Sequence, residues 1–372
     1  MEYIEDELWD IYDRSENLTG RYARRGEQGG DADYHLVVHV WVRTPDGRFL
    51  ISRRTPNKTF PLKWKITGGA AVAGDDGIHA ALRELREEMG LTLLPEDAEW
   101  IGTYRTDGGF FASFAYVALF TADIKLENVK FQKGETCGAM LCTPDEIKQM
   151  ERDGSFVRLC EHYPYYERIF NMEKMKEYGV VTLDEIDWAK VPAVAVDEYV
   201  WGGEYRPEAK AQLAYIKDKG LAVKMTCRES DPKAVHYNFY EEVWLDSCME
   251  FFFGFRFLGD YINCEMNSLG VSLIGVGNGR DDRRRIDEIT DIPNVSAEKT
   301  ANEWSVQAFF TVDELKAVFG DDLKLEKGTE FYGNFFKVGE ETHTPHYGMW
   351  NPIVWEHPDF HRPECFGKFI IE

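Results

Sequence analysis

The sequence has little of what marks secreted or membrane-bound proteins. Seven cysteines are scattered over 372 residues without a Cys-x-x-Cys pair, so neither a disulfide framework nor a cysteine metal site is indicated. No apolar run approaches the roughly 18 residues that a transmembrane helix needs. The opening MEYIEDELWDIYDRSENLTG is acidic and lacks an apolar core, so no signal peptide is expected. These absences favour a cytoplasmic protein with no membrane partner.

Positive charge is also scarce. Lysine and arginine total 43 against 66 aspartates and glutamates, which gives a net charge of -23 and a pI near 4.9. Such a surface repels nucleic-acid backbones, so a nucleic-acid partner is not expected. An anionic substrate would need local basic residues and a metal ion. Hydrophobic residues make up 44% of the chain and aromatic residues 14%, which indicates a globular protein with sheet-rich parts.

One stretch, Gly69 to Leu91, carries the strongest pattern in the chain: GAAVAGDDGIHAALRELREEMGL. Its apolar residues recur at a spacing of three and four, which predicts a helix from Asp76 to Met89. Three carboxylates, Glu84, Glu87 and Glu88, fall together away from the apolar stripe. Because like charges within one helical turn repel each other, a bound Mg²⁺ would convert this cost into a site. The alternative is a solvated charged helix face.

The spacing of this stretch resembles the signature of Nudix hydrolases. The matching residues are Gly69, Asp75, Arg83, Glu84, Leu85, Glu87, Glu88, Gly90 and Leu91. The one departure is Asp75, where the family usually has glutamate. The resemblance covers about residues 1 to 175 and implies an α/β/α sandwich.

The resemblance also implies roles for individual residues. Mg²⁺, or Mn²⁺, would be held by Glu84, Glu87 and Glu88 together with the carbonyl of Gly69. Catalysis is then expected from Glu87, Glu88, Arg83 and Glu135, which lies in the turn QKGETCG. The general base is either a glutamate of the helix or this outside acid, and both remain open. The expected reaction is hydrolysis of a diphosphate linkage in a nucleoside diphosphate derivative, for which a nucleotide sugar is one candidate.

Within that family the N-terminal half looks closest to the branch related to isopentenyl diphosphate isomerase. Arg54 and Lys58 align with the pair that holds the diphosphate, and Lys65 is a further candidate for substrate binding. An exposed turn at a strand end is the alternative for the first two. The isomerase needs Cys-Gly-His where this chain has Gly68, Gly69 and Ala70, so hydrolysis is preferred over isomerisation. His35 stands where that branch has a metal ligand, but packing in the core is the more ordinary role.

The pattern changes in the second half of the chain. Short strands rich in aromatic residues recur between turn signals, which indicates a β-sandwich. We expect a Nudix domain over 1–178, a linker over 179–192 and the sandwich over 193–372. A helix is predicted from Pro207 to Lys219 and a second, capped one from Thr311 to Phe319. The fold class is α+β, with an N-terminal α/β/α sandwich followed by an all-β sandwich.

This half resembles family 9-like carbohydrate-binding modules, on the pieces VWLDSCMEFFF, NFFKVG and HYGMWNPI with the C-terminal FGKFIIE. The resemblance implies a carbohydrate ligand, whose ring would stack on an aromatic side chain. Trp350 and Trp244 are the aromatic candidates, and Glu250 and Arg256 the polar ones. A packed core residue is the alternative for each tryptophan.

Three hypotheses follow for the whole chain. The first is a Mg²⁺-dependent pyrophosphohydrolase that acts on a small-molecule diphosphate and carries a sugar-binding domain. The second is a carbohydrate-binding protein whose Nudix half is a scaffold. The third keeps the enzyme and makes the sandwich a docking or dimerisation module, which would give a homodimer.

Overall fold

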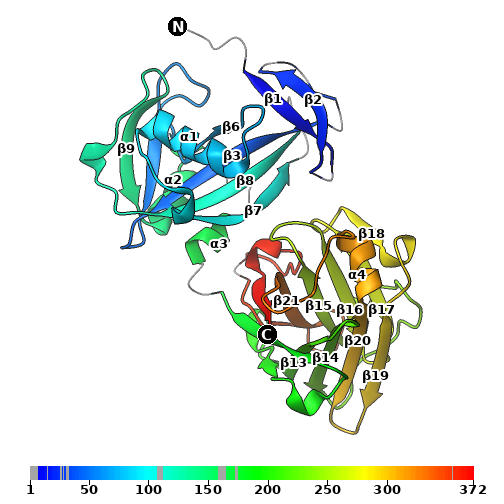
Figure 1. Cartoon of the computed structure of the whole chain (residues 1–372). Helices are drawn as coiled ribbons and strands as arrows, with labels where there is room; N and C mark the ends of the chain where they lie inside the picture. Colours follow the sequence, from blue (N-terminus) through cyan, green and yellow to red (C-terminus); the bar gives the residue numbers. More distant parts are fainter. Residues whose placement is uncertain are drawn as a thin grey trace. The chain divides into compact units, whose positions relative to one another are not determined.

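The computed structural model of the chain describes residues 7–14, 16–25, 27, 29–30, 33–106, 112–157, 165–171, 175–353 and 355–372. It consists of two compact units, Met1–Phe170 and Asn171–Glu372 (Figure 1). Within the described residues, no helix has the length and apolar character that crossing a membrane requires.

The N-terminal unit is built on a mixed sheet with helices on its faces. Its strands are β1 (Leu8–Tyr12), β2 (Leu18–Arg24), β3 (Tyr34–Arg43), β4 (Phe49–Arg54), β5 (Trp64–Lys65), β6 (Thr67–Ala70), β7 (Ala98–Thr106), β8 (Ala112–Thr121) and β9 (Thr136–Cys142). Its helices are α1 (Gly77–Met89), α2 (Pro144–Arg152) and α3 (Tyr166–Asn171), with short 3-10 turns at Pro95–Asp97 and Leu126–Asn128. Strand β3 is central, since it pairs with β1, β4, β6 and, in parallel, β8.

The alternation along β3 explains the layers of this unit. Val38 and Val40 face one side and pack in a core with Leu85 and Met89 of α1. Trp41 faces the other side, where its ring meets aromatic side chains of α3 edge-on at 5.5 Å. Because successive strand residues point to opposite faces, one strand can hold a helix on each side of the sheet. The predicted α/β/α sandwich is confirmed.

The second unit is a β-sandwich. Its strands are β10 (Glu177–Leu183), β11 (Val194–Ala195), β12 (Glu198–Gly202), β13 (Glu208–Ile216), β14 (Gly220–Arg228), β15 (Cys248–Gly254), β16 (Tyr261–Asn267), β17 (Ser272–Gly277), β18 (Arg283–Arg285), β19 (Asn294–Lys299), β20 (Trp304–Thr311), β21 (Glu330–Gly339), β22 (His346–Met349) and β23 (Gly367–Ile371). Helix α4 spans Val312–Phe319, and 3-10 turns lie at Trp188–Lys190, Val243–Leu245, Ile286–Glu288 and Pro363–Cys365.

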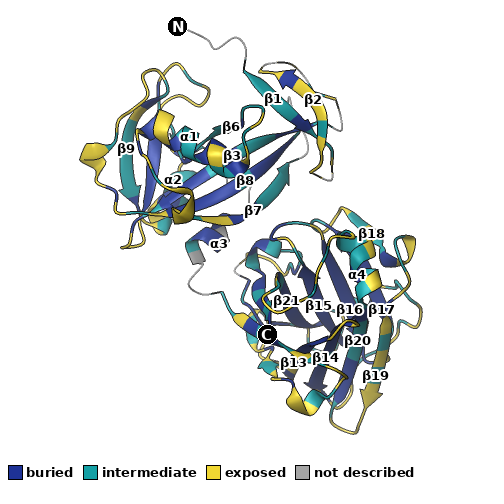
Figure 2. Cartoon of the chain, viewed as in Figure 1, coloured by how far each residue is buried: buried dark blue, intermediate teal, exposed yellow. Residues whose placement is uncertain are grey.

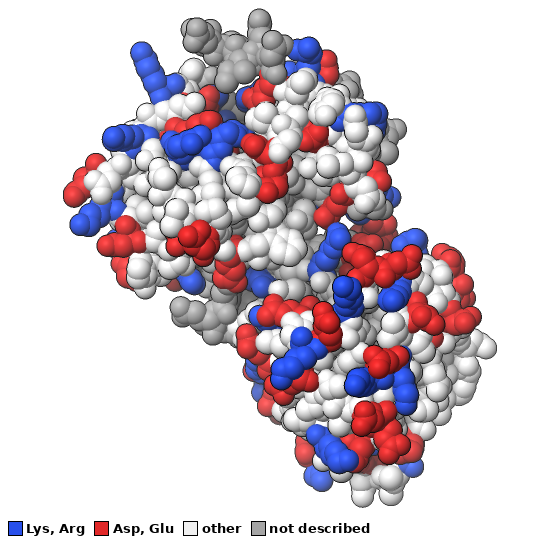
Figure 3. All heavy atoms as spheres, viewed as in Figure 1, with Lys and Arg blue, Asp and Glu red and all other residues white. Residues whose placement is uncertain are grey.

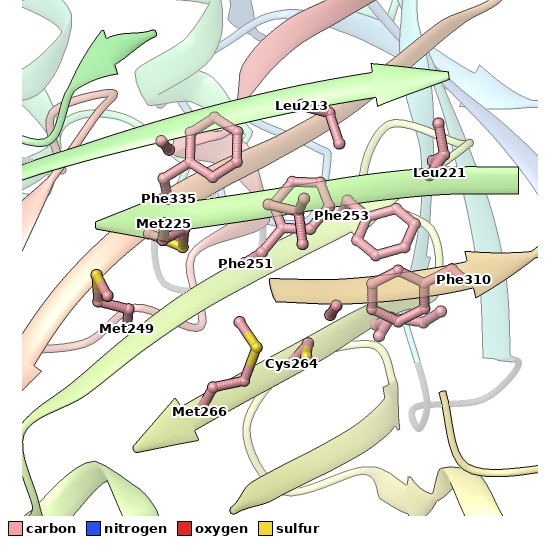
Figure 4. Close-up of a cluster of buried hydrophobic side chains, with 14 of the residues drawn as sticks. Leu213, Leu221, Met225, Met249, Phe251, Phe253, Cys264, Met266, Phe310 and Phe335 are labelled. Carbon is pink, nitrogen blue, oxygen red and sulfur yellow. The ribbon is translucent and has the colours of Figure 1, made fainter. Parts of the chain in front are cut away.

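Two layers of strands enclose the core of the sandwich. One layer runs β18-β17-β16-β15-β21-β23-β10 and the other β13-β14-β20-β19, with β10 pairing in parallel to both β23 and β13. Phe251 and Phe253 of β15 meet Leu213, Met225 and Phe310 of the opposite layer (Figure 4). Figure 2 shows these strands buried over most of their length, while the connecting turns are exposed. The predicted all-β sandwich is therefore confirmed.

Two predictions about this half differ from the structure. Strand β10 begins the second unit inside the segment assigned to the end of the first domain and to the linker 179–192, so the units divide between Phe170 and Asn171. The helix predicted from Pro207 to Lys219 is wrong, because Glu208–Ile216 forms β13. The capped helix after Thr311 is confirmed, since the Thr311 side chain accepts a hydrogen bond from the Glu314 backbone.

Candidate functional site

Helix α1 fixes the acidic residues of the N-terminal unit. Asp76 caps its start by accepting a hydrogen bond from the His79 backbone N–H at 2.9 Å. Gly90 ends it in a left-handed conformation with φ of 64°, which glycine adopts without a steric cost. Burial of Leu85 and Met89 in the core sets the rotation of the helix. The helix predicted from Asp76 to Met89 is thereby confirmed, and its glutamates are held in a fixed place.

Arg83 is the centre of the polar contacts around this helix. Its guanidinium donates to Asp75 at 3.2 Å, to Glu84 at 2.9 Å and to Glu87 at 3.4 Å. It also donates to the carbonyl oxygen of Ala70 at 2.9 Å, which ties the glycine loop to the helix. Asp75, although shorter than glutamate, therefore reaches the arginine. These contacts position the carboxylates.

Gly69 lies directly against the carboxylate of Glu84. A Cβ atom added at Gly69 would lie 2.6 Å from Glu84 Oε1 and 2.7 Å from Cδ. A side chain at this position would force the carboxylate of Glu84 to move away from the loop backbone. Gly69 therefore lies beside Glu84, while the metal-ligand role of its carbonyl stays a prediction.

Lys65 and Glu88 form a buried ion pair. Lys65 Nζ lies 2.5 Å from Glu88 Oε1, with the two side chains 11% and 7% exposed. Burial raises the pKa of Glu88, and the charge of Lys65 opposes that rise. The second oxygen, Glu88 Oε2, is buried and has no hydrogen-bond partner in the described part of the chain. One acceptor in this site therefore lacks a donor or cation.

Crowding of carboxylates also affects Glu84. Burial raises its pKa to about 7, and the charges of Glu88 and Glu87 contribute in the same direction, whereas Arg83 opposes them. Both effects disfavour the charged form. A group of carboxylates with this electrostatic cost gains stability when a cation binds among them.

Within the described residues, no three His, Cys, Asp or Glu side chains are arranged to hold a metal ion, and Glu84, Glu87 and Glu88 are paired with Arg83 and Lys65 instead. The donor set nevertheless fits a divalent cation, which prefers oxygen ligands. Glu88 has a free buried oxygen, and the absence of a Cβ at Gly69 leaves space beside Glu84.

The basic candidates and the outside acid approach the same carboxylates. Lys58 forms an ion pair with Glu135. The charges of Glu135 and Arg54 both act on the pKa of Glu88, the first raising it and the second lowering it. Arg54 donates through Nε to the carbonyl of Thr59 at 2.5 Å. Lys65, Arg54 and Glu135 thus lie close enough to act on Glu88, and Lys58 joins them through its pair with Glu135.

One residue near this site had no role in the sequence analysis. His39 on β3 lies opposite Gly68 in the strand register and contacts the hydroxyl of Tyr165 through Nδ1 at 2.6 Å. Burial and the neighbouring Lys65 lower its pKa to about 4, so the ring is neutral at pH 7. The sequence signal for His39 was its place as a polar residue among the apolar residues of strand β3. His35 stacks on the ring of Trp9 at 4.4 Å, which is the packing role considered for it.

The second unit contains a cavity of about 420 Å³ on the outer side of the β15–β16 layer. This size lies within the range of small-molecule sites. The lining residues are Tyr240, Trp244, Glu250, Phe252, Asn263, Glu265, Leu273, Arg280, Arg283, Val338, Glu340, Tyr347, Pro358, Asp359, Phe360 and His361. Aromatic rings and charged groups therefore face the same space, which suits a ligand with an apolar face and polar edges.

Two of the four carbohydrate-binding candidates line this cavity and two do not. Trp244 and Glu250 are among the lining residues. Trp350 is 3% exposed and stacks on Phe369 at 5.2 Å inside the sandwich core, so its ring cannot take a sugar. Arg256 is an exposed residue just beyond β15 and does not line the cavity. For Trp350 the structure favours the alternative of a packed core residue, and the role of Arg256 stays a prediction.

Sequence reasoning missed most of the cavity. Glu265 on β16 is the strand partner of Glu250, Asn263 lies two residues before it, and Tyr347 lies on β22, which pairs with β21 next to β15. On the face drawn in Figure 3, acidic side chains gather in patches with basic ones beside them. Because charged patches of both signs occur on this face, an acidic or basic segment of the sequence does not by itself indicate a binding site.

Comparison with known proteins separates the two halves in the same way. A family model described as NUDIX domain matches residues 33–160, and one described as carbohydrate-binding family 9 matches residues 181–371. An uncharacterized Nudix hydrolase of Listeria monocytogenes is 28% identical over 169 residues, which cover 45% of this chain and 95% of the relative. One of Streptomyces coelicolor is 39% identical over 106 residues, covering 28% of this chain and 58% of that protein.

Among solved structures, a family 9 carbohydrate binding module from Caldicellulosiruptor kristjanssonii in complex with cellotriose is similar to the second half. The two share 14% identity at a TM-score of 0.40, over 53% of this chain and 94% of that one.

Proposed function

The chain belongs to carbohydrate-binding family 9 and joins that module to a Nudix pyrophosphohydrolase domain, and from this premise we propose that it hydrolyses the diphosphate linkage of a nucleoside diphosphate derivative. A nucleotide sugar is the substrate class that would use both halves. One observation carries the proposal: Glu84, Glu87 and Glu88 are held on one helix beside Gly69, with basic side chains around them.

The residues of α1 and its loop would hold a divalent cation, Mg²⁺ or Mn²⁺. Its ligands would be the carboxylates of Glu84, Glu87 and Glu88 and the carbonyl of Gly69. Such a cation neutralises phosphate charge and lowers the pKa of bound water when it is present. Arg83 keeps the carboxylates in place through its contacts with Asp75 and Ala70.

The surrounding side chains would bind the diphosphate and accept the proton of the attacking water. Arg54, Lys58 and Lys65 would bind the oxygens of the diphosphate, because charge-assisted hydrogen bonds are strong and the protein is otherwise acidic. Glu135 would accept the proton of the attacking water, with Glu88 or Glu87 as the alternative base. Binding of the diphosphate would replace the contact between Lys58 and Glu135 and leave that carboxylate available.

The thiol that an isomerase would need at position 68 does not fit there. A Cβ added at Gly68 would lie 2.3 Å from the backbone oxygen of Val38 on the neighbouring strand. A cysteine there would push β3 and β6 apart. Hydrolysis is therefore favoured even if the N-terminal unit descends from the isomerase-related branch.

The second unit would bind the sugar part of a ligand in its cavity. Trp244 offers a ring face for stacking on a pyranose, and Glu250 offers carboxylate oxygens for hydroxyl groups. A mutation in this cavity should then weaken sugar binding without changing hydrolysis of a sugar-free diphosphate.

The test is a screen of the full chain with Mg²⁺ and a panel of nucleoside diphosphate derivatives, followed by release of phosphate-containing products. Glu88→Gln should lower turnover by 10²-fold or more, the order expected when a metal site is disabled. Glu99→Gln, at an exposed position of β7, is the matched control and should retain full activity. Unchanged turnover in Glu88→Gln would show that the reaction occurs elsewhere.

A further inference from the structure

Building on the proposed sugar-binding role of the cavity, we infer that its ligand is an amino sugar whose protonated amine binds between the carboxylates of Glu250 and Glu265. The inference goes further than sugar binding because it fixes the charge of the ligand. It depends on the placement of these two side chains and on the described lysines and arginines, none of which forms an ion pair with either of them.

Strand pairing forces the two glutamates together. Glu250 on β15 and Glu265 on β16 are direct partners in the antiparallel register. Residues opposite each other in such a pair have Cβ atoms about 5 Å apart and point to the same face. The neighbours Met249 and Phe251 face the sandwich core, so both glutamates face the cavity instead. Both are buried, with 2% and 4% of their surface exposed.

Neighbouring donors leave these carboxylates largely unsatisfied. Asn263 donates to Glu265 Oε1 at 2.7 Å. The other oxygen, Glu265 Oε2, is buried without a partner among the residues that the structure describes. In the described part of the chain, no hydrogen bond or ion pair joins Glu250 to a donor. A buried ionised carboxylate without a partner destabilises the fold, so a cation or a proton between the two glutamates would stabilise it.

The terminal nitrogens of Arg283 and one of Arg280 bind other groups, whereas Arg283 Nε is buried without a partner among the described residues. Arg283 donates to the carbonyl oxygens of Gly277 at 2.9 Å and Gly275 at 3.1 Å, and it also contacts the Asn263 side chain. Arg280 pairs with Asp359 at 3.1 Å. They act on the glutamates only through longer-range attraction.

When all of its acids are ionised, the cavity carries more negative than positive charge. Four carboxylates, Glu250, Glu265, Glu340 and Asp359, face two guanidinium groups. Burial, with the charges of Glu265 and Glu340, raises the pKa of Glu250, and burial raises that of Glu265 to about 7. A neutral sugar offers no opposite charge, so the two glutamates relieve their repulsion only by holding a proton. An ammonium group would instead form charge-assisted hydrogen bonds with both carboxylates.

The walls of the cavity suit the rest of such a ligand. Trp244, Tyr240, Tyr347 and Phe360 provide aromatic surface around the acidic floor. Aromatic faces also attract a cationic ligand through the ring quadrupole. A hexosamine combines an apolar ring face, hydroxyl groups and one amine, and the cavity of about 420 Å³ is large enough for a small molecule of this kind.

Isothermal titration of the full chain at pH 6.5 with glucosamine, glucose and N-acetylglucosamine tests the inference. These sugars differ only at one ring position, where the amine is charged, replaced by hydroxyl or acylated. Glucosamine should bind at least 10-fold more tightly than either neutral sugar. Glu250→Gln and Glu265→Gln should abolish that preference, while Glu298→Gln, exposed on β19, should keep it. Thermal unfolding of each variant establishes that it is folded.

The possible failures are distinct. Equal affinity for glucosamine and glucose in the wild-type chain would overturn the cationic preference and leave the sugar-binding role intact. No heat with any of the three sugars, and none with galactosamine or mannosamine, would contradict the sugar-binding role itself. Because these comparisons use the wild-type protein, they do not depend on whether a variant folds.

Discussion

Replacement of Gly69 by alanine adds a single carbon at the point where the glycine loop meets helix α1. The new Cβ would lie 2.6 Å from Glu84 Oε1, 2.7 Å from Cδ and 2.9 Å from Oε2. The backbone of Gly69 is not in the left-handed region, so alanine introduces no conformational strain of its own. The perturbation therefore acts almost entirely on the carboxylate of Glu84.

The size of the effect follows from these distances. Ordinary van der Waals contact is about 3.5 Å, so the carboxylate has to move by roughly 1 Å. It is the end of a flexible side chain, and the free energy of unfolding should change by less than about 1 kcal/mol. A displacement of this size at a catalytic group can reduce the rate by about 10²-fold. We expect kcat/KM to fall by that order while the fold stays stable.

The assay is hydrolysis of the best diphosphate substrate under saturating Mg²⁺, with denaturant unfolding measured in parallel. Gly138→Ala is the control within the same unit, because its added Cβ would have its nearest neighbour, Arg53 Cβ, at an ordinary 3.4 Å. Activity of Gly69→Ala within about twofold of wild type would refute the assignment of Glu84 as a ligand in the site. A loss of activity matched by a loss of stability would refute the steric reasoning.

Three further predictions concern stability. Lys65→Met removes the partner of buried Glu88. It should lower the free energy of unfolding by about 3 kcal/mol without Mg²⁺ and by less with saturating Mg²⁺. Equal losses in denaturant titrations with and without Mg²⁺ would contradict a cation site at Glu88. Glu265 keeps a proton in the folded chain up to a pKa of about 7, above the ordinary 4.5, so stability should fall by roughly 3 kcal/mol as pH rises between these values. In Glu265→Gln that slope should be smaller by this contribution, with Glu84 supplying part of what remains, and an unaltered slope would disprove the cause. Phe251→Ala, at 0% exposure and stacked on Phe253 at 4.5 Å, should cost 3–5 kcal/mol in urea unfolding; a loss below 1 kcal/mol would mean a loosely packed core.

Local pattern was sufficient to predict α1. Its apolar spacing, its Asp76 cap and its terminal Gly90 all lie within the helix or next to it. The acidic cluster was visible for the same reason, since Glu84, Glu87 and Glu88 are neighbours in the sequence. Features determined by nearby residues can be predicted from the chain alone.

The helix expected from Pro207 to Lys219 failed because two local signals competed. The segment EAKAQLAYI contains residues with high helix propensity, but its buried residues alternate as Ala209, Ala211, Leu213 and Tyr215. Pairing with β14 along the whole strand settles the competition in favour of β13. Tertiary contacts of this kind lie outside the segment and are not visible in its composition.

The cavity shows the same limit for function. Trp244 and Glu250 could be identified because both lie in one segment, whereas Glu265 and Asn263 reach the cavity only through pairing of β16 with β15. Trp350 has the residue type of a sugar-binding platform, yet it fills the core against Phe369. Residue type therefore indicates which ligand contacts a side chain could make, and its burial determines whether a ligand can reach it.

The most direct measurement of the central claim is the anomalous difference density of Mn²⁺ in crystals of the full chain. The account predicts a peak within coordination distance of Glu84 and Glu88 oxygens and of the Gly69 carbonyl, and no such peak in Glu84→Gln/Glu88→Gln crystals. Absence of manganese beside these carboxylates in the wild-type crystals would contradict it.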